Sequence, residues 1–368
     1  MFLCIAFPSC KGRKELYVLM KKTVFIIAIA IVAFEIVGCN KSEKEIDKEY
    51  SSGVVLIKNT GYYELKISDD ISAYFTDYSE ENGLSNFTLD EDSIVTVTAF
   101  GTGFFVSEKG EIATNNHVVG AMISEKQALK AKNKVVTALK NVCRSEYNDY
   151  DQVLGEINTA LFAYIYTDTY DTDYSKLREA QSVCENYMNE YSAIYNYLCN
   201  VDVSNVEFSY NHHISVAYND EYVTSSTDFI PCVLKKTDTK NDLAIIQLKN
   251  KKTPEGKYIF DIPANNPMET TSLFYPGKND KLFMIGFNLG PNLAITENGV
   301  KSQCTTGMVS QDRETNYLYS IPSLPGSSGA PVVNQKGELV AVNFAGIGST
   351  QSFNYGVKVK YLRELLKK

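Results

Sequence analysis

Short runs rich in β-branched and aromatic residues, bounded by glycine, asparagine or aspartate, fill most of the sequence from residue 53 onward. Before residue 122 these runs are "GVVLIKN", "YYELKI", "SIVTVTAFGTGFFVS" and "EIATNNHVV". After residue 205 come more of the same kind, among them "DLAIIQL", "KLFMIGFN" and "ELVAVNFAG". Many short strands at regular spacing, with turn signals between them, indicate a sandwich or a barrel. The sequence therefore predicts an all-β fold.

One internal block has helical rather than strand periodicity. Ser124 and Gln127 have the spacing of a capping box, which starts helices. Further on, apolar residues recur in steps of three and four, as in the seam between packed helices: Leu177, Ala180, Cys184, Tyr187, Tyr191, Ile194 and Leu198. We therefore predict a helical hairpin or three-helix unit over residues 122–200, inserted in a β domain that spans residues 53–368.

The N-terminus has the features of an export signal. In "MKKTVFIIAIAIVAFEIVGC", Met20 to Cys39, two lysines precede an apolar stretch too short to span a bilayer but suited to a signal peptide. Its end, "IVGC", resembles the bacterial lipobox, in which the cysteine is lipidated and becomes the mature N-terminus. We expect residues 1–39 to be a signal peptide with a lipobox, with Met20 as the true start, and residues 40–52 to be a polar tether. A plain cleaved signal or a short membrane anchor is the alternative.

The net charge argues against one class of partner. The 368 residues carry a formal net charge of −8 and contain no basic run. Contacts of Lys and Arg with phosphate supply most of the affinity of nucleic-acid-binding proteins. We therefore expect no nucleic-acid partner. The lipobox predicts a bacterial outer membrane lipoprotein, held to the membrane through Cys39, whose domain faces the periplasm or the cell surface.

The cysteines and histidines give little sign of a metal site. Export implies an oxidising compartment, where Cys143 could form a disulfide with Cys184 or Cys199. The cysteine spacings do not fit a zinc site, and His212 and His213 have no third ligand nearby in the sequence. We expect no metal and no cofactor.

Three residue types needed for acyl transfer occur in suitable places. The stretch "SLPGSSGAPVVN", residues 323–334, holds two serines in a glycine-flanked turn that could expose a hydroxyl. Acyl transfer requires an oxygen nucleophile, an imidazole that takes its proton and a carboxylate that orients the imidazole. The candidates are Ser328, His117 in "GEIATNNHVVG" and Asp242 in "TKNDLAIIQL". Each of them alone also fits an ordinary loop, strand-start or hairpin residue, and the serine stretch alone favours a hairpin loop.

Six segments together resemble the trypsin-like serine proteases, and most of all the bacterial HtrA/Deg-type protease domain. They occur in the order seen in that family and cover about residues 53–121 and 205–368: "GTGFFVSEKGEIATNNHVV", "KKTDTKNDLAIIQL", "FMIGFN", "TTGMVS", "PGSSGAPVVNQKGELVAVNFAG" and "FNYGVKVKYL". The resemblance implies two antiparallel six-stranded β-barrels with the active site in the cleft between them. It also implies hydrolysis of peptide bonds.

The resemblance also implies a role for each site residue. His117 matches the general base and Ser328 the nucleophile. Asp242 matches the orienting acid, with Asp238 as a nearby rival. The backbone N–H groups of Gly326 and Ser328 match the oxyanion hole, where a lost donor slows an enzyme by roughly a hundredfold or more.

The sequence departs from the family pattern next to the nucleophile. The family motif Gly-Asn-Ser-Gly-Gly-Pro is Gly-Ser-Ser-Gly-Ala-Pro here, so Ala330 adds a methyl group beside the site. No PDZ-like stretch follows the protease segment, so substrate capture by such a domain is not expected. By resemblance, six residues would wall the substrate pocket: Ser320, Ile321, Pro322, Asn343, Phe344 and Ala345. None of these six residues is acidic, so none can pair with a lysine or arginine of the substrate. The pocket is therefore expected to favour a substrate residue with a small or medium apolar side chain.

The sequence thus predicts an exported, lipid-anchored serine endopeptidase with a protein or peptide substrate. The alternative is a catalytically silent protease-fold protein that binds or scaffolds through the helical insertion. That insertion could gate the cleft, bind a protein partner or decorate the barrel.

Overall fold

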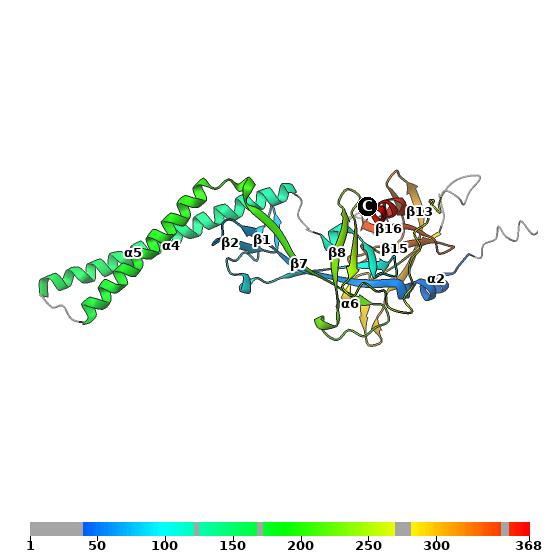
Figure 1. Cartoon of the computed structure of the whole chain (residues 1–368), viewed down its shortest axis with the longest axis horizontal. Coiled ribbons are helices and arrows are strands. Elements are labelled where there is room, and N and C mark those ends of the chain that lie inside the picture. Colours follow the sequence, from blue (N-terminus) through cyan, green and yellow to red (C-terminus); the bar gives the residue numbers. More distant parts are fainter. Residues whose placement is uncertain (1–39, 121–124, 168–171, 269–280, 347–352) are drawn as a thin grey trace, which may run out of the picture.

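Two antiparallel barrels, a long helical pair and a short N-terminal helix form the part of the chain that the structure describes. The structure is a computed structural model that describes residues 40–120, 125–167, 172–268, 281–346 and 353–368. The barrels lie together, and the helical pair extends away from them (Figure 1).

The first barrel closes because strand β1 pairs along both of its edges. β1 (Val54–Lys66) runs antiparallel to β5 on one side and to β7 on the other. Around the ring the order is β1, β5 (Val97–Phe105), β6 (Glu111–Thr114), β9 (Leu243–Leu248), β8 (Ile230–Asp238) and β7 (Glu207–Tyr218). An additional strand, β2 (Ser72–Phe75), pairs with the far end of β1.

The second barrel is also a closed ring of six antiparallel strands. Its order is β10 (Lys281–Gly286), β13 (Gln303–Asp312), β14 (Asn316–Tyr319), β17 (Asn354–Lys358), β16 (Leu339–Gly346) and β15 (Pro331–Asn334). β15 pairs back to β10 and closes the ring. The predicted fold of two antiparallel six-stranded barrels is therefore confirmed.

Strand β9 shows how the two barrels pack together. Leu243 and Ile245 belong to a core cluster that also contains Phe283 of the second barrel. Ala244 and Ile246 belong to a cluster formed with other residues of the first barrel. Because successive side chains of a strand point to opposite faces, both faces of β9 are buried. This double burial is why "LAIIQL" is apolar almost throughout, and it holds the barrels in contact.

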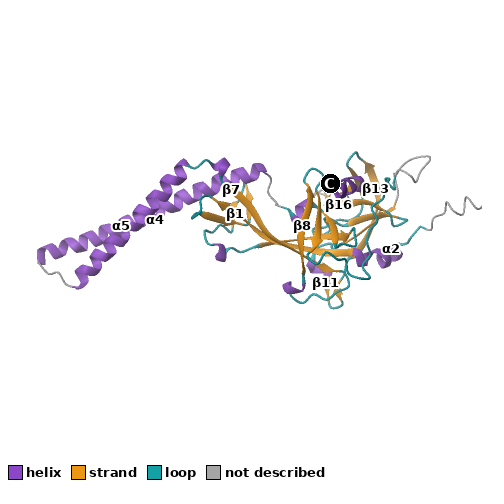
Figure 2. Ribbon diagram, in the orientation of Figure 1, coloured by secondary structure: helices purple, strands orange, loops and turns teal. Residues whose placement is uncertain are grey.

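The insertion is a helical hairpin that projects from the first barrel as an arm (Figure 1). It consists of α4 (Glu125–Thr167) and α5 (Thr172–Asn200), which pack side by side. The outer parts of β1 and β7 extend toward this arm as a two-stranded ribbon (Figure 2). Tyr63 of β1 packs there with Leu139 and Leu198 of the helices. Of the two predicted arrangements, the described residues form the hairpin.

The structure corrects the prediction of a polar tether over residues 40–52. Helix α2 (Glu43–Tyr50) occupies most of that range, and Ser42 and Glu45 form a reciprocal capping box at its start. Ile46 and Tyr50 are buried in the core cluster that the two barrels share. Residues four apart lie on the same face of a helix, so two apolar side chains suffice to dock an otherwise polar segment.

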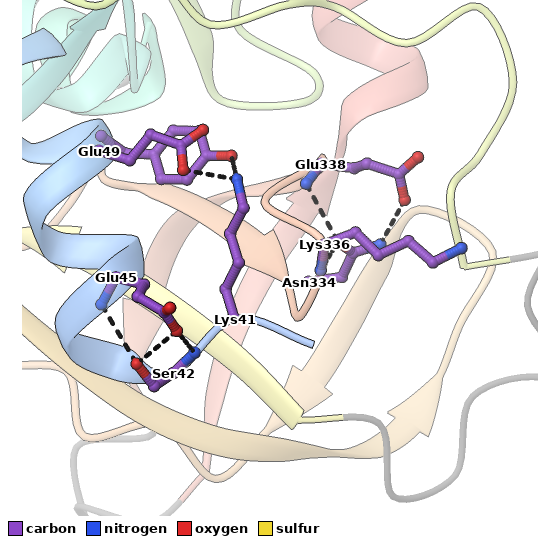
Figure 3. A network of polar contacts seen from close by, with 8 residues as sticks. Lys41, Ser42, Glu45, Glu49, Asn334, Lys336 and Glu338 are labelled. Carbon is purple, nitrogen blue, oxygen red and sulfur yellow. Dashed lines mark hydrogen bonds and ion pairs between the residues drawn. The ribbon is translucent and has the colours of Figure 1, made fainter. Parts of the chain in front are cut away.

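A polar cluster fastens the start of α2 to the second barrel (Figure 3). Lys41 Nζ lies 2.6 Å from both Glu49 Oε2 and the Tyr50 hydroxyl. The Lys41 backbone N–H donates to the Gln335 carbonyl at 2.8 Å. Gly337, with φ +85°, lies so close that a Cβ atom there would be 1.8 Å from the Tyr50 hydroxyl. Only glycine fits this turn, and the cluster leaves no free tether after Lys41.

The remaining elements are short. The strand pairs are β3 (Asp77–Ser79) with β4 (Gly83–Ser85), and β11 (Ile295–Thr296) with β12 (Gly299–Val300). The helices are α3 (Asn116–Val119), α6 (Pro291–Ala294) and α7 (Val359–Lys367), with single 3-10 turns at Ser51–Gly53, Glu91–Ser93, Val203–Asn205 and Ser226–Asp228. The predicted signal peptide and Cys39 lie outside the described residues. Within the described ranges, no helix has both the length and the apolar character required to cross a bilayer.

The possible disulfides of Cys143 are not formed. Cys143 and Cys184 are buried free thiols, and Cys199 is an exposed free thiol. Cys143 packs in the cluster that contains Leu139, whereas Cys184 packs in a separate cluster of the arm. A disulfide requires Cα atoms within about 7 Å and facing side chains, and packing in two separate clusters does not provide this.

Candidate active site

A short helix after β6 carries His117 beside Asp242. The His117 backbone N–H donates to Asp242 Oδ1 at 2.9 Å, and the ring atom Nδ1 lies 2.6 Å from Asp242 Oδ2. With Nδ1 protonated and donating to the carboxylate, Nε2 is left as a proton acceptor. The His117 side chain is 47% exposed, so the ring is accessible to a substrate.

The loop before β9 decides which of two aspartates meets the histidine. Asp238 accepts hydrogen bonds from the Asn241 backbone N–H at 3.1 Å and from Asn241 Nδ2 at 2.8 Å. Asp242 has φ +52°, a left-handed conformation that aspartate adopts more readily than most residues. Asn115 Nδ2 donates to the Asp242 carbonyl at 2.9 Å. Asp242 is thereby turned to His117, and Asp238 is held within its own loop.

A buried asparagine supports the helix that carries His117. Asn59 on β1 is completely buried, and its Nδ2 donates to the carbonyl of Val118 at 3.1 Å. On its other side, Asn59 Oδ1 lies 3.1 Å from Nδ1 of His212, whose pKa is lowered by burial. The sequence carries a signal for this role that is easily missed, namely an amide at the end of the largely apolar run "VVLIKN".

Two consecutive tight turns present Ser328. The Ser327 N–H donates to the Leu324 carbonyl at 3.0 Å, and the Ala330 N–H donates to the Ser327 carbonyl at 3.1 Å. The third residues of these turns are Gly326, with φ +100°, and Gly329, with φ +87°. Such turns need a positive φ at that position, which glycine adopts without strain. The two glycines around the serines thus allow both turns.

Thr102 of the first barrel joins these turns to the rest of the site. Its backbone N–H donates to the Ser328 carbonyl at 2.8 Å, and its hydroxyl donates to the Gly326 carbonyl at 2.7 Å. The Thr114 hydroxyl in turn donates to the Thr102 carbonyl at 2.8 Å. One threonine therefore fixes two carbonyls of the opposite barrel, a role that its place in "GTGFF" does not reveal.

These contacts leave two backbone donors free beside Ser328. Within the described residues, the N–H groups of Gly326 and Ser328 donate no hydrogen bond. Their own carbonyls are both held by Thr102. Two fixed, unpaired N–H groups next to a hydroxyl are the arrangement needed to bind a developing oxyanion.

Ser328 lies near His117 without a hydrogen bond between them. A Cβ atom on Gly329 would lie 2.3 Å from Thr114 Oγ1 and 3.2 Å from the Asn115 backbone nitrogen. The turn of Ser328 therefore packs against the end of β6, three residues before His117. In the part of the chain described, the half-buried Ser328 hydroxyl has no hydrogen-bond partner.

Two of the six predicted pocket residues cannot line a pocket. Ile321 is completely buried in the core of the second barrel, and Asn343 is completely buried with its side chain hydrogen-bonded to Ser327. Asn343 lies on β16, where the strand alternation turns it inward. Ile321 lies two residues beyond the end of β14 and continues the alternate burial of Tyr317 and Tyr319. Of the others, Ser320 is half-buried, Pro322 is exposed and Phe344 is half-buried. The side chain of Ala345 lies outside the described residues.

No metal cluster accompanies these groups. Among the residues that the structure describes, no three His, Cys, Asp or Glu side chains are grouped so as to hold an ion. The site thus combines the Ser328 hydroxyl, the His117 imidazole and the Asp242 carboxylate with two free backbone N–H groups. This combination is suited to nucleophilic attack on a carbonyl carbon.

A family model supports the predicted resemblance. Residues 198–342 match the trypsin-like peptidase domain. The chain is similar to trypsin-like peptidases. The matched range contains Asp242 and Ser328, whereas His117 and the arm's first helix precede it. No curated protein matches the sequence.

The chain is also distantly similar to solved structures of bacterial proteases. The chain matches the serine endoprotease from Yersinia pestis with 13% identity and a TM-score of 0.41, covering 89% of this chain and 66% of that one. It matches the HtrA-type protease AlgW, solved with a decapeptide, with 13% identity and a TM-score of 0.43, covering 89% of this chain and 67% of that one. The chain thus spans only about two thirds of the length of these proteases.

Proposed function

We propose that this protein is a serine endopeptidase in which Ser328 is the nucleophile, His117 the general base and Asp242 the residue that orients it. The observation that carries this proposal is the pair of contacts from His117 to both oxygens of Asp242. The free N–H groups of Gly326 and Ser328 support it, as does the family match over residues 198–342.

The proposed reaction uses each group in turn. The Ser328 oxygen attacks the peptide carbonyl carbon while its proton passes to His117 Nε2. The oxyanion that forms accepts hydrogen bonds from the Gly326 and Ser328 N–H groups, and Asp242 stabilises the imidazolium. Breaking of the C–N bond then passes the proton to the leaving amine and leaves an acyl group on Ser328. Water, deprotonated by His117, then attacks the ester carbonyl carbon. The C–O bond to Ser328 breaks, the proton passes from His117 to the Ser328 oxygen, and the carboxylic acid is released.

The missing hydrogen bond between Ser328 and His117 fits this mechanism. Catalytic hydrogen bonds are often long or absent in a free enzyme and tighten when the substrate binds. Because Thr102 and two tight turns fix the backbone of Ser328, a rotation of its side chain is the smallest change that could bring the hydroxyl toward the ring.

A fluorophosphonate probe tests the proposal directly. We expect one probe molecule per protein, bonded to Ser328, as located by mass spectrometry of the digested adduct. Protein unfolded by heat serves as the control and should not react, because an unactivated serine is a weak nucleophile. Absence of labelling in folded protein, or a label on another residue, would remove the proposed nucleophile.

We further propose that Cys39 carries a lipid that holds the protein to a bacterial outer membrane. Support comes from "IVGC" in the sequence and from the docking of the chain at Lys41, which would keep the barrels close to the bilayer. We expect Cys39→Ala to move the protein from the membrane fraction to the soluble fraction, with Cys304→Ala as the matched control. Unchanged fractionation of the Cys39 variant would contradict the lipid anchor.

A pocket on the arm favours a second candidate function. It has a volume of about 230 Å³ and is lined by Cys143, Arg144, Tyr147, Tyr191, Ser192 and Tyr195. Tyrosine and arginine are enriched where proteins bind partners. The alternative function is therefore a catalytically silent protein that binds a protein partner through the arm. The fluorophosphonate experiment separates the two functions, because the silent protein would not react.

A further inference from the structure

A network of buried polar side chains lies beneath the turn that presents Ser328. Tyr319, Ser327 and Asn343 are completely buried. The Tyr319 hydroxyl lies 2.7 Å from Asn343 Oδ1 and 3.0 Å from the Tyr355 carbonyl. Asn343 Nδ2 lies 3.0 Å from Ser323 Oγ, 3.0 Å from the Ser327 carbonyl and 3.3 Å from Ser327 Oγ. None of these groups has a role in the proposed reaction.

Tyr319 and the Ser327 carbonyl together set which way the Asn343 amide faces. Complete burial raises the pKa of Tyr319 well above its ordinary value, so its hydroxyl stays protonated and donates. The Ser327 carbonyl can only accept, so the NH₂ group of Asn343 faces it. Asn343 Oδ1 is then left to accept from the Tyr319 hydroxyl at 2.7 Å, and it lies closer to that hydroxyl than the Tyr355 carbonyl does, at 3.0 Å. The oxygen of Asn343 therefore faces Tyr319, and the NH₂ group is directed to Ser323 and Ser327.

Asn343 also holds the turn through its backbone. Its N–H donates to the Ala330 carbonyl at 2.9 Å, and its carbonyl accepts from the Gly329 N–H at 2.7 Å. With the side-chain contact to the Ser327 carbonyl, Asn343 restrains the chain on both sides of Ser328. It does so without using the N–H or the hydroxyl of Ser328, and so leaves both for a substrate.

We propose that Tyr319 is a positioning residue for the nucleophile. Through Asn343, it holds the Ser327–Ala330 turn in one conformation. In that conformation the Ser328 hydroxyl and the N–H groups of Gly326 and Ser328 point to the same substrate carbonyl. This inference rests on the proposed function. Without the Tyr319 hydroxyl, Asn343 Oδ1 has no other side-chain donor among the described residues, and the amide is held only through its NH₂ contacts with Ser323 and Ser327, so its orientation becomes less fixed.

Tyr319→Phe removes the hydroxyl alone and keeps the ring. We expect the maximal rate of fluorophosphonate labelling, kinact, to fall roughly tenfold to a hundredfold in the full-length protein, because small displacements of reacting groups have effects of that size. The probe's KI should stay within about twofold, since the binding surface is unchanged. The matched control is Tyr317→Phe on the same strand, where the lost hydroxyl accepts from Asn266 Nδ2 at 2.7 Å instead.

The control separates positioning from loss of stability. Both variants lose one buried hydroxyl, so we expect similar falls in Tm, but only Tyr319→Phe should lower kinact. Wild-type kinact in Tyr319→Phe, or equal losses in both variants, would overturn the inference. If Tyr319→Phe does not fold, Ser323→Ala provides a second test, because Ser323 is half-buried and its hydroxyl belongs to the same network. An unchanged kinact in Ser323→Ala would also overturn the inference. Wild-type protein that does not label at all would instead remove the proposed function.

Discussion

Replacement of Ser328 by alanine should lower the rate of hydrolysis of fluorescein-labelled casein by roughly a millionfold, as found when the nucleophile of such a site is removed. The residual rate is expected to remain above that of the uncatalysed reaction, because the backbone N–H groups of residues 326 and 328 and the substrate-binding surface stay in place. The fold should be unaffected. Ser328 is half-buried, and its side chain has no hydrogen-bond partner within the described residues, so Tm should not fall.

Ser310→Ala is the matched control for this change. Ser310 is also a half-buried serine of the second barrel, on β13, and no polar contact of its side chain is seen in the described chain. Its variant should cleave casein at the wild-type rate. If Ser328→Ala retained activity within about tenfold of the wild type, another group would have to be the nucleophile.

Replacement of Asp242 by asparagine should lower kcat by about 10⁴-fold and leave KM nearly unchanged. The reason lies in the two contacts of this carboxylate. The His117 backbone N–H donates to one oxygen, at 2.9 Å, so in the variant the amide oxygen has to occupy that place. The NH₂ group then faces His117 Nδ1, which can only accept its hydrogen bond. The proton of the neutral ring is forced onto Nε2, the atom that has to accept the proton of Ser328.

Asp238→Asn provides a closely matched control four residues earlier. Asp238 contacts Asn241 and not His117, so its variant should keep kcat within about tenfold of the wild type. Steady-state hydrolysis of the same labelled casein gives kcat and KM for both variants. Equal losses in the two variants would mean that the loop, rather than the carboxylate at Asp242, supports catalysis.

Local patterns predicted the secondary structure well and the docking of short segments poorly. Strand runs such as "LAIIQL" and the helical seam of the arm are visible in the sequence because neighbours along the chain set their periodicity. The sequence predicts a tether where helix α2 lies, because only Ile46 and Tyr50 form the apolar face of that helix. The pocket prediction was wrong for Ile321 and Asn343, because the family pattern gives positions along a strand but not which side chains a particular barrel buries.

The strand and helix segments, the place of the insertion and the candidate residues His117, Asp242 and Ser328 are all visible in the amino-acid sequence. The folded chain adds that Asp242 rather than Asp238 contacts His117, that Thr102 joins the barrels, and that Tyr319 and Asn343 support the turn of Ser328. The two kinds of information differ in the sequence separation of the residues that interact. Strand and helix periods arise between near neighbours, whereas the hydrogen bond from Thr102 to Gly326 joins residues 224 positions apart. Such a contact exists only after both barrels have closed and packed together.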